Sequence, residues 1–315
     1  MILLAHYLGT RMYKSLLPLA LLASTLIAHA NTAPTTPSTE SRDATITVYA
    51  AGDIADCRTK KSTARSIATA TLINAGIADD PQAIVLTMGD HTYPVGVQAE
   101  FETCYQPSWG KFKDRTYPSP GNHEYYSPNG IGYYQYFGEA AGSQRQSYYS
   151  VNKGAWHIIS LNSNLNKEDL QTQLDWLAQD LKKNRSACTL AYWHHPVYSS
   201  GLHGNNKHMK PVWEMLMAAK ADVILSGHDH HYERFALQNS QGDEDIQTGI
   251  REFIVGTGGA KLAPVFWKKS NSEIVNTNTN GVLKLLLKKQ GYEWQFLPIE
   301  GSSFTDQGST ACHSK

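Results

Sequence analysis

The sequence has no excess of either charge sign, because 28 Lys and Arg residues balance 28 Asp and Glu residues. This balance gives no reason to expect nucleic acid or an acidic membrane as a partner. The chain also has no internal repeat and no linker-like stretch after Asp43. A length of 315 residues can hold one large α/β domain or two small ones, and the missing linker favours one domain.

The chain lacks an apolar run long enough to cross a bilayer, which needs about 20 residues. The N-terminal run Leu16–Ala28 is shorter, follows Lys14 and leads into the small-residue motif Ala28-His29-Ala30. This pattern predicts a signal peptide over residues 1–30, with an uncleaved membrane anchor as the alternative. Residues 31–44, rich in Pro, Thr and Ser, are predicted to be a disordered leader. We therefore expect a secreted or periplasmic protein after cleavage near Ala30, without a membrane span in the mature chain.

Cysteine is scarce, with four residues in the chain. An exported chain meets oxidising conditions, so these cysteines can form disulfides. Cys57 and Cys104 both follow predicted strand-end motifs, which favours a bond between them. Cys188 and Cys312 would then form the remaining pair, and free thiols are the alternative in each case.

Apolar runs that alternate with a helical pattern predict an α/β fold. Ala44–Ile54 and Gln82–Asp90 read as buried strands, and Thr63–Ala75 between them reads as a helix that Gly76 ends. Strand, helix and strand with short joins form a βαβ unit, so these two strands should be parallel. Further strands are predicted within 116–124, 155–163, 187–196, 221–230, 251–259, 281–290 and 291–300, and further helices over 168–182 and 211–220.

Polar side chains follow five of the predicted strands, directly past their carboxyl ends: Asp53, Asp90, Asn122-His123, His194 and His228–His230. Each motif alone is usually a turn or a surface loop. The His-x-His spacing is more telling, because alternate residues of an extended chain face the same side. Loops at the carboxyl ends of strands converge on one crevice in open α/β sheets. The five motifs together therefore predict one metal site.

The ordered motifs "GDI", "GDHTY", "GNHE", "HHP" and "GHDHHYER" resemble those of the calcineurin-like metallophosphoesterases. The resemblance covers about Ile46 to Phe253. Tyr93, together with Ala55 where many of that superfamily have a second histidine, is similar to the purple acid phosphatases. The resemblance implies an α/β four-layer sandwich of two mixed β-sheets flanked by helices, with a dinuclear metal site at the carboxyl ends of the strands.

The domain organisation expected from this resemblance is a catalytic domain over 45–300 and a C-terminal tail over 301–315. A short leader separates Ala30 from the first strand. We therefore expect the additional N-terminal β-domain of the plant purple acid phosphatases to be absent. The substrate preference of those relatives is not carried over for this reason.

The resemblance also implies which residues hold two cations. The first, ferric ion would be held by Asp53, Asp90, Tyr93 and His230. The second ion, iron, zinc or manganese, would be held by Asp90, Asn122, His194 and His228. Phenolate and carboxylate are hard anionic donors that suit a highly charged ion. Two carboxylates, a phenolate and a bridging hydroxide would total about −4 against about +5 from one ferric and one divalent ion, and the resulting positive centre would attract phosphate.

The expected reaction is hydrolysis of phosphate monoesters, as in acid phosphatases, by a metal-bound hydroxide that attacks phosphorus. By resemblance His123 would contact phosphate and protonate the leaving group, with Glu124 orienting it, and His203 would contact phosphate. The segment "VYSSG" lacks the G-x-S-x-G pattern of a serine nucleophile. A phosphodiesterase acting on nucleotide or lipid head-group diesters, and a binding protein without turnover, are the alternatives. The expected partner is a phosphorylated small molecule, and the sequence does not indicate an oligomeric state.

Overall fold

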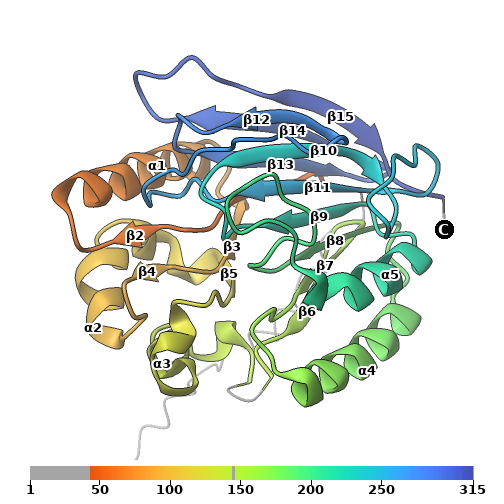
Figure 1. Ribbon diagram of the computed structural model, residues 1–315, viewed down its shortest axis with the longest axis horizontal. Helices are drawn as coiled ribbons and strands as arrows, with labels where there is room; N and C mark the ends of the chain where they lie inside the picture. The colour runs from red at the N-terminus through yellow and green to blue at the C-terminus, as the bar shows by residue number, and fades with distance from the viewer. Residues whose placement is uncertain (1–42, 144–145, 315) are drawn as a thin grey trace, which may run out of the picture. The chain divides into compact units, whose positions relative to one another are not determined.

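Two mixed β-sheets form the centre of the fold seen in the computed structural model, which describes residues 43–143 and 146–314 (Figure 1). The six-stranded sheet has the order β15-β14-β13-β1-β3-β5 and the seven-stranded sheet the order β12-β10-β11-β9-β8-β7-β6. A further pair, β2 and β4, stands apart from both sheets. The expected α/β fold with two mixed sheets and flanking helices is confirmed.

The strands have the following bounds. The six-stranded sheet contains β1 (Ile46–Ala51), β3 (Ile84–Met88), β5 (Thr116–Ser119), β13 (Gly281–Lys288), β14 (Gly291–Pro298) and β15 (Gln307–Ala311). The seven-stranded sheet contains β6 (Tyr149–Lys153), β7 (Trp156–Ser160), β8 (Cys188–Tyr192), β9 (Val223–Ser226), β10 (Tyr232–Gln238), β11 (Ile250–Val255) and β12 (Ser272–Asn276). The short pair is β2 (Ala55–Asp56) and β4 (Thr92–Tyr93).

The α-helices are α1 (Lys60–Asp79), α2 (Gln98–Glu100), α3 (Ile131–Phe137), α4 (Lys167–Lys183) and α5 (Lys210–Ala218). The 3₁₀- and π-helical turns are η1 (Phe101–Tyr105), η2 (Trp109–Arg115), η3 (Glu124–Tyr126), η4 (Pro128–Gly130), η5 (Gly138–Ala141) and η6 (Lys207–Met209). Among the residues with described positions, no helix has both the length and the apolarity needed to span a membrane. The predicted signal peptide and most of the predicted leader lie outside the described residues.

Each sheet contains a run of adjacent parallel strands. β1 pairs with β3 and β3 with β5 in parallel, as the βαβ pattern predicts. In the other sheet β7, β8, β9 and β11 are parallel neighbours. Antiparallel strands extend the six-stranded sheet on one side, from β13 to β15, and the seven-stranded sheet at both ends. The loops that follow the carboxyl ends of these parallel strands can therefore come together.

Residues 301–315 differ from the predicted tail, because part of the segment is an edge strand. β15 pairs antiparallel with β14 over five residue pairs, from Gly291 with Ala311 to Gln295 with Gln307. Gly308 lies directly on the Trp294 ring, where a Cβ would come within 2.3 Å of a ring carbon. The packing of this glycine on a tryptophan helps to hold the C-terminal strand in the sheet.

Helices α4 and α5 cover the outer face of the seven-stranded sheet and lie side by side (Figure 1). Leu170 and Leu177, two turns apart on α4, are buried against this sheet, as the 3.6-residue period predicts. The Asn166 side chain begins α4 by accepting hydrogen bonds from the backbone N–H groups of Glu168 and Asp169.

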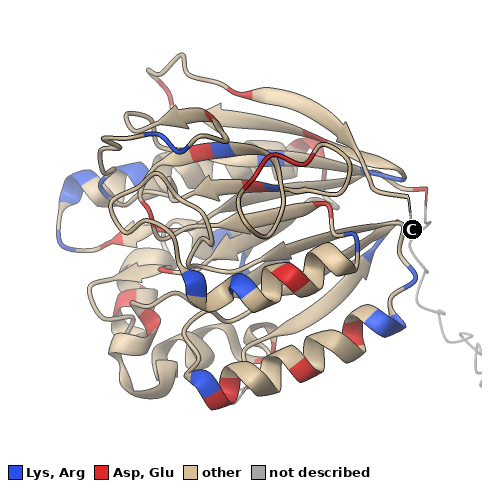
Figure 2. Ribbon diagram, turned by 45° about the vertical axis from the view of Figure 1, so that its right-hand side comes forward, with Lys and Arg blue, Asp and Glu red and all other residues tan. Residues whose placement is uncertain are grey.

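Helix α1 is longer than the predicted 63–75 and does not end at Gly76. Instead Gly76 lies inside the helix and faces the Tyr49 ring of β1, where a Cβ would come within 1.9 Å of the phenol oxygen. The glycine is therefore used for close packing of helix on sheet, and the helix continues to Asp79. Figure 2 shows positive and negative residues interspersed over helices and strands, as expected from the balanced composition.

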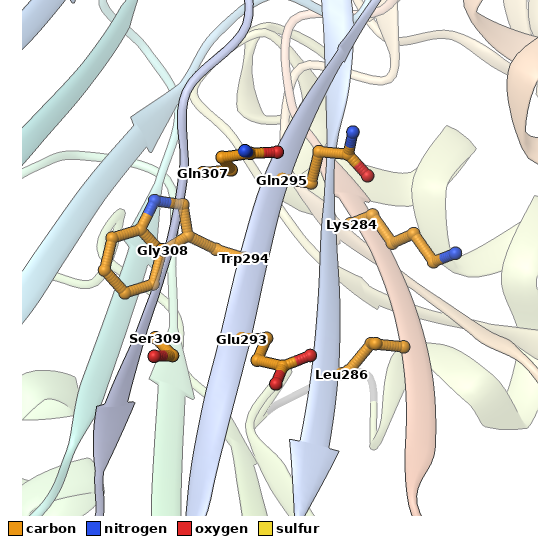
Figure 3. A pocket seen from close by; sticks show the side chains of 8 residues that line it. All are labelled: Lys284, Leu286, Glu293, Trp294, Gln295, Gln307, Gly308 and Ser309. Atoms are coloured by element: carbon orange, nitrogen blue, oxygen red, sulfur yellow. The ribbon is translucent and has the colours of Figure 1, made fainter.

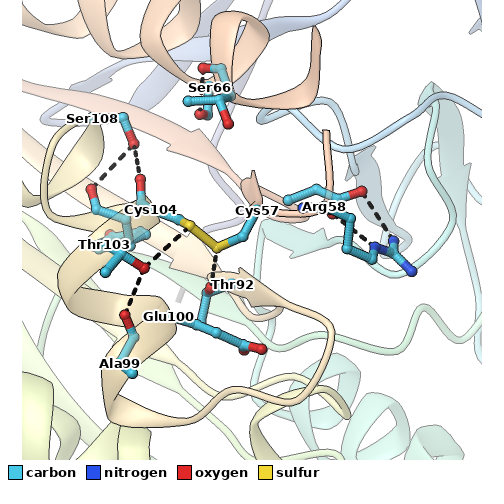
Figure 4. Close-up of a disulfide and its surroundings, with 12 residues drawn as sticks. Cys57, Arg58, Ser66, Thr92, Ala99, Glu100, Thr103, Cys104 and Ser108 are labelled. Carbon is cyan, nitrogen blue, oxygen red and sulfur yellow. Dashed lines mark hydrogen bonds and ion pairs between the residues drawn. A yellow bond between two sulfur atoms is a disulfide. The ribbon is translucent and has the colours of Figure 1, made fainter. Parts of the chain in front are cut away.

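Two disulfides confirm both predicted cysteine pairings. Cys57 is bonded to Cys104, with 5.6 Å between the Cα atoms, and its sulfur lies 3.8 Å from the Thr92 hydroxyl (Figure 4). Because Thr92 belongs to β4 and precedes Tyr93, this disulfide braces the segment that carries the predicted phenol ligand. Cys188 of β8 is bonded to Cys312, which follows β15, and this bond links the two large sheets.

Candidate metal centre

The predicted site residues lie past the carboxyl ends of strands from both large sheets. Asp53 and Asp90 follow the ends of β1 and β3 by two residues, and His194 and His228 follow the ends of β8 and β9 by the same spacing. Asn122 follows β5 by three residues. Backbone hydrogen bonds join neighbouring strand ends, including Asp53 N–H to the Gly89 carbonyl (3.1 Å). The parallel strands thus bring these residues to one edge, as the sequence predicts.

A first cluster joins three of the predicted ligands. The Tyr93 hydroxyl lies 2.9 Å from Asp53 Oδ1 and 3.1 Å from His230 Nε2. His230 Nε2 is in turn 3.2 Å from Asp53 Oδ1. The other ring nitrogen, His230 Nδ1, lies 2.9 Å from the Lys261 carbonyl. Its N–H can therefore donate to that carbonyl, which leaves Nε2 to face the cluster.

A second cluster is centred on His194. His194 Nε2 lies 3.0 Å from Asn122 Oδ1, 3.2 Å from His228 Nδ1 and 3.4 Å from Asp90 Oδ2. His194 Nδ1 lies 2.6 Å from the Met88 carbonyl at the end of β3. This contact fixes the imidazole ring so that Nε2 points at the other three side chains.

The two clusters are adjacent. One ligand atom each from Asp53, Asp90 and His194 lies within 4.8 Å of the others. The backbone N–H of His228, from the second cluster, also donates to Asp53 Oδ2 at 2.9 Å. The structure therefore brings all seven predicted metal-binding residues into one continuous group: Asp53, Asp90, Tyr93, Asn122, His194, His228 and His230.

Three of these residues have left-handed backbone conformations that are uncommon outside glycine. The φ angles are 59° at Asp53, 49° at Asp90 and 68° at His228. Such strain is retained where surrounding structure demands it, and it concentrates at functional sites. Gly227 shows how tightly the strand ends approach, because a Cβ there would come within 2.6 Å of Asp53 Oδ2.

The buried carboxylates of this group have no fixed cationic partner. Asp53 and Asp90 are 0% and 2% exposed, and within residues 43–143 and 146–314 neither forms an ion pair with Lys or Arg. Burial of ionised carboxylates without counter-charge is costly. For Asp90, burial raises the pKa, but the neighbouring His194 and His123 outweigh it and hold the pKa well below the ordinary value.

The histidines beside these carboxylates carry the compensating charge. Burial disfavours protonated imidazole at His194, yet Asp90 raises its pKa to about 9. In the same way Asp53 overcomes burial at His230 and raises its pKa to about 9. His228 lacks such a partner, so burial and the nearby His194 lower its pKa. In the metal-free protein, the protons on His194 and His230 therefore balance the carboxylate charge that bound cations would otherwise balance.

The donor atoms fit a pair of metal ions. Carboxylate, phenol and amide oxygens with imidazole nitrogens are ligands for iron, zinc and manganese. Burial raises the pKa of the Tyr93 phenol well above its ordinary value, and Asp53 raises it further. A cation bound at the phenol oxygen would favour loss of this proton.

His123 lies beside both clusters. Its backbone N–H donates to Asp90 Oδ1 at 2.9 Å, and its ring centroid is 4.3 Å from that of Tyr93. His123 Nδ1 lies 2.7 Å from the Pro94 carbonyl, and Nε2 lies 3.8 Å from Asp90 Oδ2. The His123 side chain is 22% exposed. It can therefore contact both the metal-binding residues and a molecule bound beside them.

Glu124 does not orient His123 as expected. Its carboxylate instead accepts backbone hydrogen bonds from Asp90, His91 and Gly121, at 2.7–2.9 Å. Glu124 therefore joins the loop after β3 to the loop after β5. The position of Glu124 directly after His123 in the sequence does not reveal this role, because the role depends on backbone N–H groups that the fold brings to its carboxylate.

His203 lies over the second cluster and is exposed. Its ring centroid is 4.2 Å from that of His228. The second histidine of the "HHP" motif, His195, also contacts this side, with its ring centroid 4.3 Å from that of His228. His195, which the sequence reading left outside the ligand set, forms a possible metal-binding group with His194 and His228.

Tyr126 was not singled out in the sequence, yet it contacts two residues of the group. Its hydroxyl accepts a hydrogen bond from Asn122 Nδ2 at 3.0 Å, and its ring centroid is 4.6 Å from that of His123. The side chain is 60% exposed. The only sequence signal was a tyrosine four residues after Asn122, which is too common a feature to predict the contact.

A separate cavity of about 430 Å³ lies on strands β13, β14 and β15 (Figure 3). Its lining includes Lys284, Glu293, Gln295 and Gln307, and none of the predicted site residues. The group at the strand ends is therefore the stronger candidate for chemistry.

Comparison with known proteins gives independent findings. A family model described as calcineurin-like phosphoesterase matches residues 46–232. Purple acid phosphatase 1 of Ipomoea batatas is 31% identical over 173 residues, which cover 48% of this chain and 36% of that protein. This chain therefore spans less than half of the length of that relative.

Two solved structures share the fold. A purple acid phosphatase from yellow lupin (Lupinus luteus) seeds has a TM-score of 0.71 at 15% identity, covering 86% of this chain and 54% of its own. GAP50, described as the anchor in the inner membrane complex of Plasmodium, has a TM-score of 0.63 at 16% identity, covering 86% and 89%. At these identities the likeness concerns the fold alone.

Proposed function

The chain belongs to the calcineurin-like phosphoesterase family, and from this premise we propose that it hydrolyses phosphate monoesters at a centre of two metal ions. The observation that carries the proposal is the convergence of seven donor side chains from both sheets, with Asp53, Asp90 and His194 within 4.8 Å of one another. Similarity to a purple acid phosphatase supports the choice of reaction.

In this proposal two sets of residues hold the ions, and Asp90 belongs to both. The first set, for ferric iron, is Asp53, Asp90, Tyr93 and His230. The second set, for iron, zinc or manganese, is Asp90, Asn122, His194 and His228. Bound ions would supply positive charge that polarises a phosphoryl oxygen and lowers the pKa of water.

The residues of the chain supply binding and proton transfer. Because His123 Nδ1 can donate to the Pro94 carbonyl, Nε2 is left to face the ester. A protonated His123 would donate from Nε2 to the leaving alcohol oxygen, and that oxygen would then depart as a neutral alcohol. His203, above His228, would donate a hydrogen bond to a phosphate oxygen from the opposite side.

The expected location is outside the cytoplasm. Two disulfides are formed, Cys57–Cys104 and Cys188–Cys312, and disulfides persist chiefly in oxidising compartments. An exported chain could act on phosphorylated small molecules outside the cell. Release of an epitope-tagged full-length chain into the periplasm or medium, with a shortened N-terminus, would support this location, and retention in the cytoplasm would contradict it.

Paired assays test the reaction. Metal-loaded protein is given nitrophenyl phosphate and bis-nitrophenyl phosphate at equal concentrations, and nitrophenol release is measured. We expect the monoester to be hydrolysed with the higher kcat/KM. A higher kcat/KM for the diester would identify a phosphodiesterase instead, and no turnover of either ester would contradict hydrolysis.

The matched variant for these assays is His194→Ala. This change removes the nitrogen at the centre of the second cluster and should abolish turnover together with one bound ion per chain. Full activity with full metal content in His194→Ala would contradict the assigned ligand set.

A further inference from the structure

We propose that Asp229 is a positioning residue that holds the loop Ser199–Gly204 and thereby fixes His203 over the second cluster. The inference rests on the proposed function, because it assigns His203 to phosphate binding. Asp229 stands between the two histidines of the "GHDHHYER" motif. No ligand role is assigned to it above.

The tight turn between β9 and β10 serves two purposes, because its side chains face two different parts of the molecule. His228 and His230 point into the metal-binding group. The intervening Asp229 and, further along, Glu233 point to the other side, where both carboxylates contact the loop Ser199–Gly204. The segment His228–Glu233, which supplies two predicted ligands, therefore also holds the loop that carries His203 by hydrogen bonds.

Both oxygens of the Asp229 carboxylate accept a hydrogen bond from this loop. Its Oδ2 accepts a hydrogen bond from the Ser199 hydroxyl at 2.5 Å, and its Oδ1 accepts from the His203 backbone N–H at 3.0 Å. The Ser199 oxygen in turn accepts from the Gly201 N–H at 2.9 Å. Asp229 is 1% exposed, so water does not weaken these charged hydrogen bonds.

Gly201 shows that the loop is fitted to this carboxylate. A Cβ on Gly201 would come within 2.2–2.6 Å of the Asp229 carboxyl atoms. Only glycine lets the loop pass so closely. A Gly-rich loop without such an anchor would populate many backbone conformations, and the anchor removes that freedom at the residue next to the phosphate site.

Glu233 also holds the loop, at Ser200, which lies between the two residues that Asp229 contacts. Its two oxygens accept from the Ser200 N–H and from the Ser200 hydroxyl. His231 Nε2 lies 2.9 Å from Glu233 Oε2 and can balance its charge. The Ser200 hydroxyl oxygen also accepts from the Lys269 N–H at 2.8 Å, which ties the loop to the segment after β11. Of these two carboxylates, Asp229 is the one that contacts the backbone of His203.

The test is the isosteric change Asp229→Asn. An amide has NH₂ in place of one of the two carboxylate oxygens, so in this geometry it cannot accept from both the Ser199 hydroxyl and the His203 N–H, and it carries no negative charge. We expect hydrogen exchange of the loop Ser199–Gly204 to accelerate at least tenfold and the Kd of inorganic phosphate to rise about tenfold, since hydrogen bonds to charged groups have about this effect. Metal content should remain that of the wild type.

Three further single substitutions and one double variant complete the experiment. Ser199→Ala removes the hydroxyl that donates to Asp229 and should also accelerate hydrogen exchange of the loop. This variant replaces Asp229→Asn as the test if Asp229→Asn binds less metal than the wild type. His203→Ala should weaken phosphate binding, and adding Asp229→Asn to it should cause no further loss. The control is Asp245→Asn, because Asp245 likewise accepts from one hydroxyl and from backbone amides, in a turn elsewhere in the chain. Its phosphate affinity should match the wild type.

The outcomes separate the inference from the proposed function. Unchanged loop exchange and unchanged phosphate affinity in both Asp229→Asn and Ser199→Ala would overturn the inference, even with an active wild-type enzyme. A faster loop exchange with unchanged phosphate affinity would also overturn it, because His203 would then act independently of its anchor. Loosened exchange and weaker phosphate binding in a wild-type chain that hydrolyses no ester would uphold the inference while contradicting the proposed reaction.

Discussion

Metal loading of the metal-free protein should release about three protons at pH 7. With pKa values of about 9, His194 and His230 are each about 99% protonated at that pH. The Tyr93 phenol, whose pKa burial raises well above the ordinary value, adds the third proton. Each of these atoms must lose its proton to become a ligand.

The same arithmetic fixes the direction and size of the pH dependence. The two histidine pKa values are raised, so their protons are held at pH 7 and compete with metal ions more strongly as pH falls. With three protons released, the apparent constant for loading both ions should fall about a thousandfold for each pH unit between 8 and 6. His228, whose pKa is lowered, is already neutral and adds nothing.

Isothermal titration in buffers of different ionisation enthalpy measures the released protons directly. Tyr93→Phe is the matched control, because it removes the phenol proton and should release about one proton fewer. Any proton lost by bound water contributes equally to both proteins and cancels in the difference. Equal proton release by the two proteins would refute the role of the phenol, and release of less than one proton by the wild type would refute the reasoning as a whole.

Three other predictions concern single contacts. Tyr126→Phe removes the acceptor for the Asn122 amide and should raise the Kd of the second ion several-fold; unchanged affinity in a metal titration would show that the amide needs no such partner. Gly227→Ala puts a Cβ within 2.6 Å of Asp53 Oδ2 and should empty the first site, so full metal content by elemental analysis would contradict the close approach. Replacing Cys188 and Cys312 by serine opens a closed loop of sequence separation 124 and should lower the free energy of unfolding in urea by about 3–5 kcal/mol; a loss under about 1 kcal/mol would argue that the bond adds little.

Strand-end positions were the part of the site that sequence could predict. Asp53, Asp90, His194 and His228 each follow an apolar strand at the same spacing, and parallel strands must bring such positions to one edge. The ordered motifs then distinguished ligands from ordinary turns. The pairing of Cys57 with Cys104 was predictable for the same reason, because both follow strand-end motifs.

Contacts that depend on side-chain direction could not be predicted. Asp229 lies within a recognised motif, yet nothing in the sequence shows that its carboxylate meets the loop carrying His203. Tyr126 and His195 likewise acquire their positions from tertiary packing. Glu124 follows His123 directly, but its carboxylate turns to backbone amides of the loops after β3 and β5.

The remaining differences in the fold have similar causes. Gly76 looks like a helix end in sequence, because glycine is a poor helix former, but packing on Tyr49 outweighs that cost. The segment between β4 and β6 forms several short helical turns. These turns are too short to show a helical period of apolar residues in the sequence. β15 is an exposed edge strand, so it lacks the apolar alternation that marks a buried strand.

The most direct test of the whole account is metal analysis of natively purified protein together with its visible spectrum. The account predicts two metal ions per chain, at least one of them iron, and a visible absorption band that Tyr93→Phe abolishes. Fewer than two ions in catalytically active protein, or a band that persists unchanged in Tyr93→Phe, would contradict it.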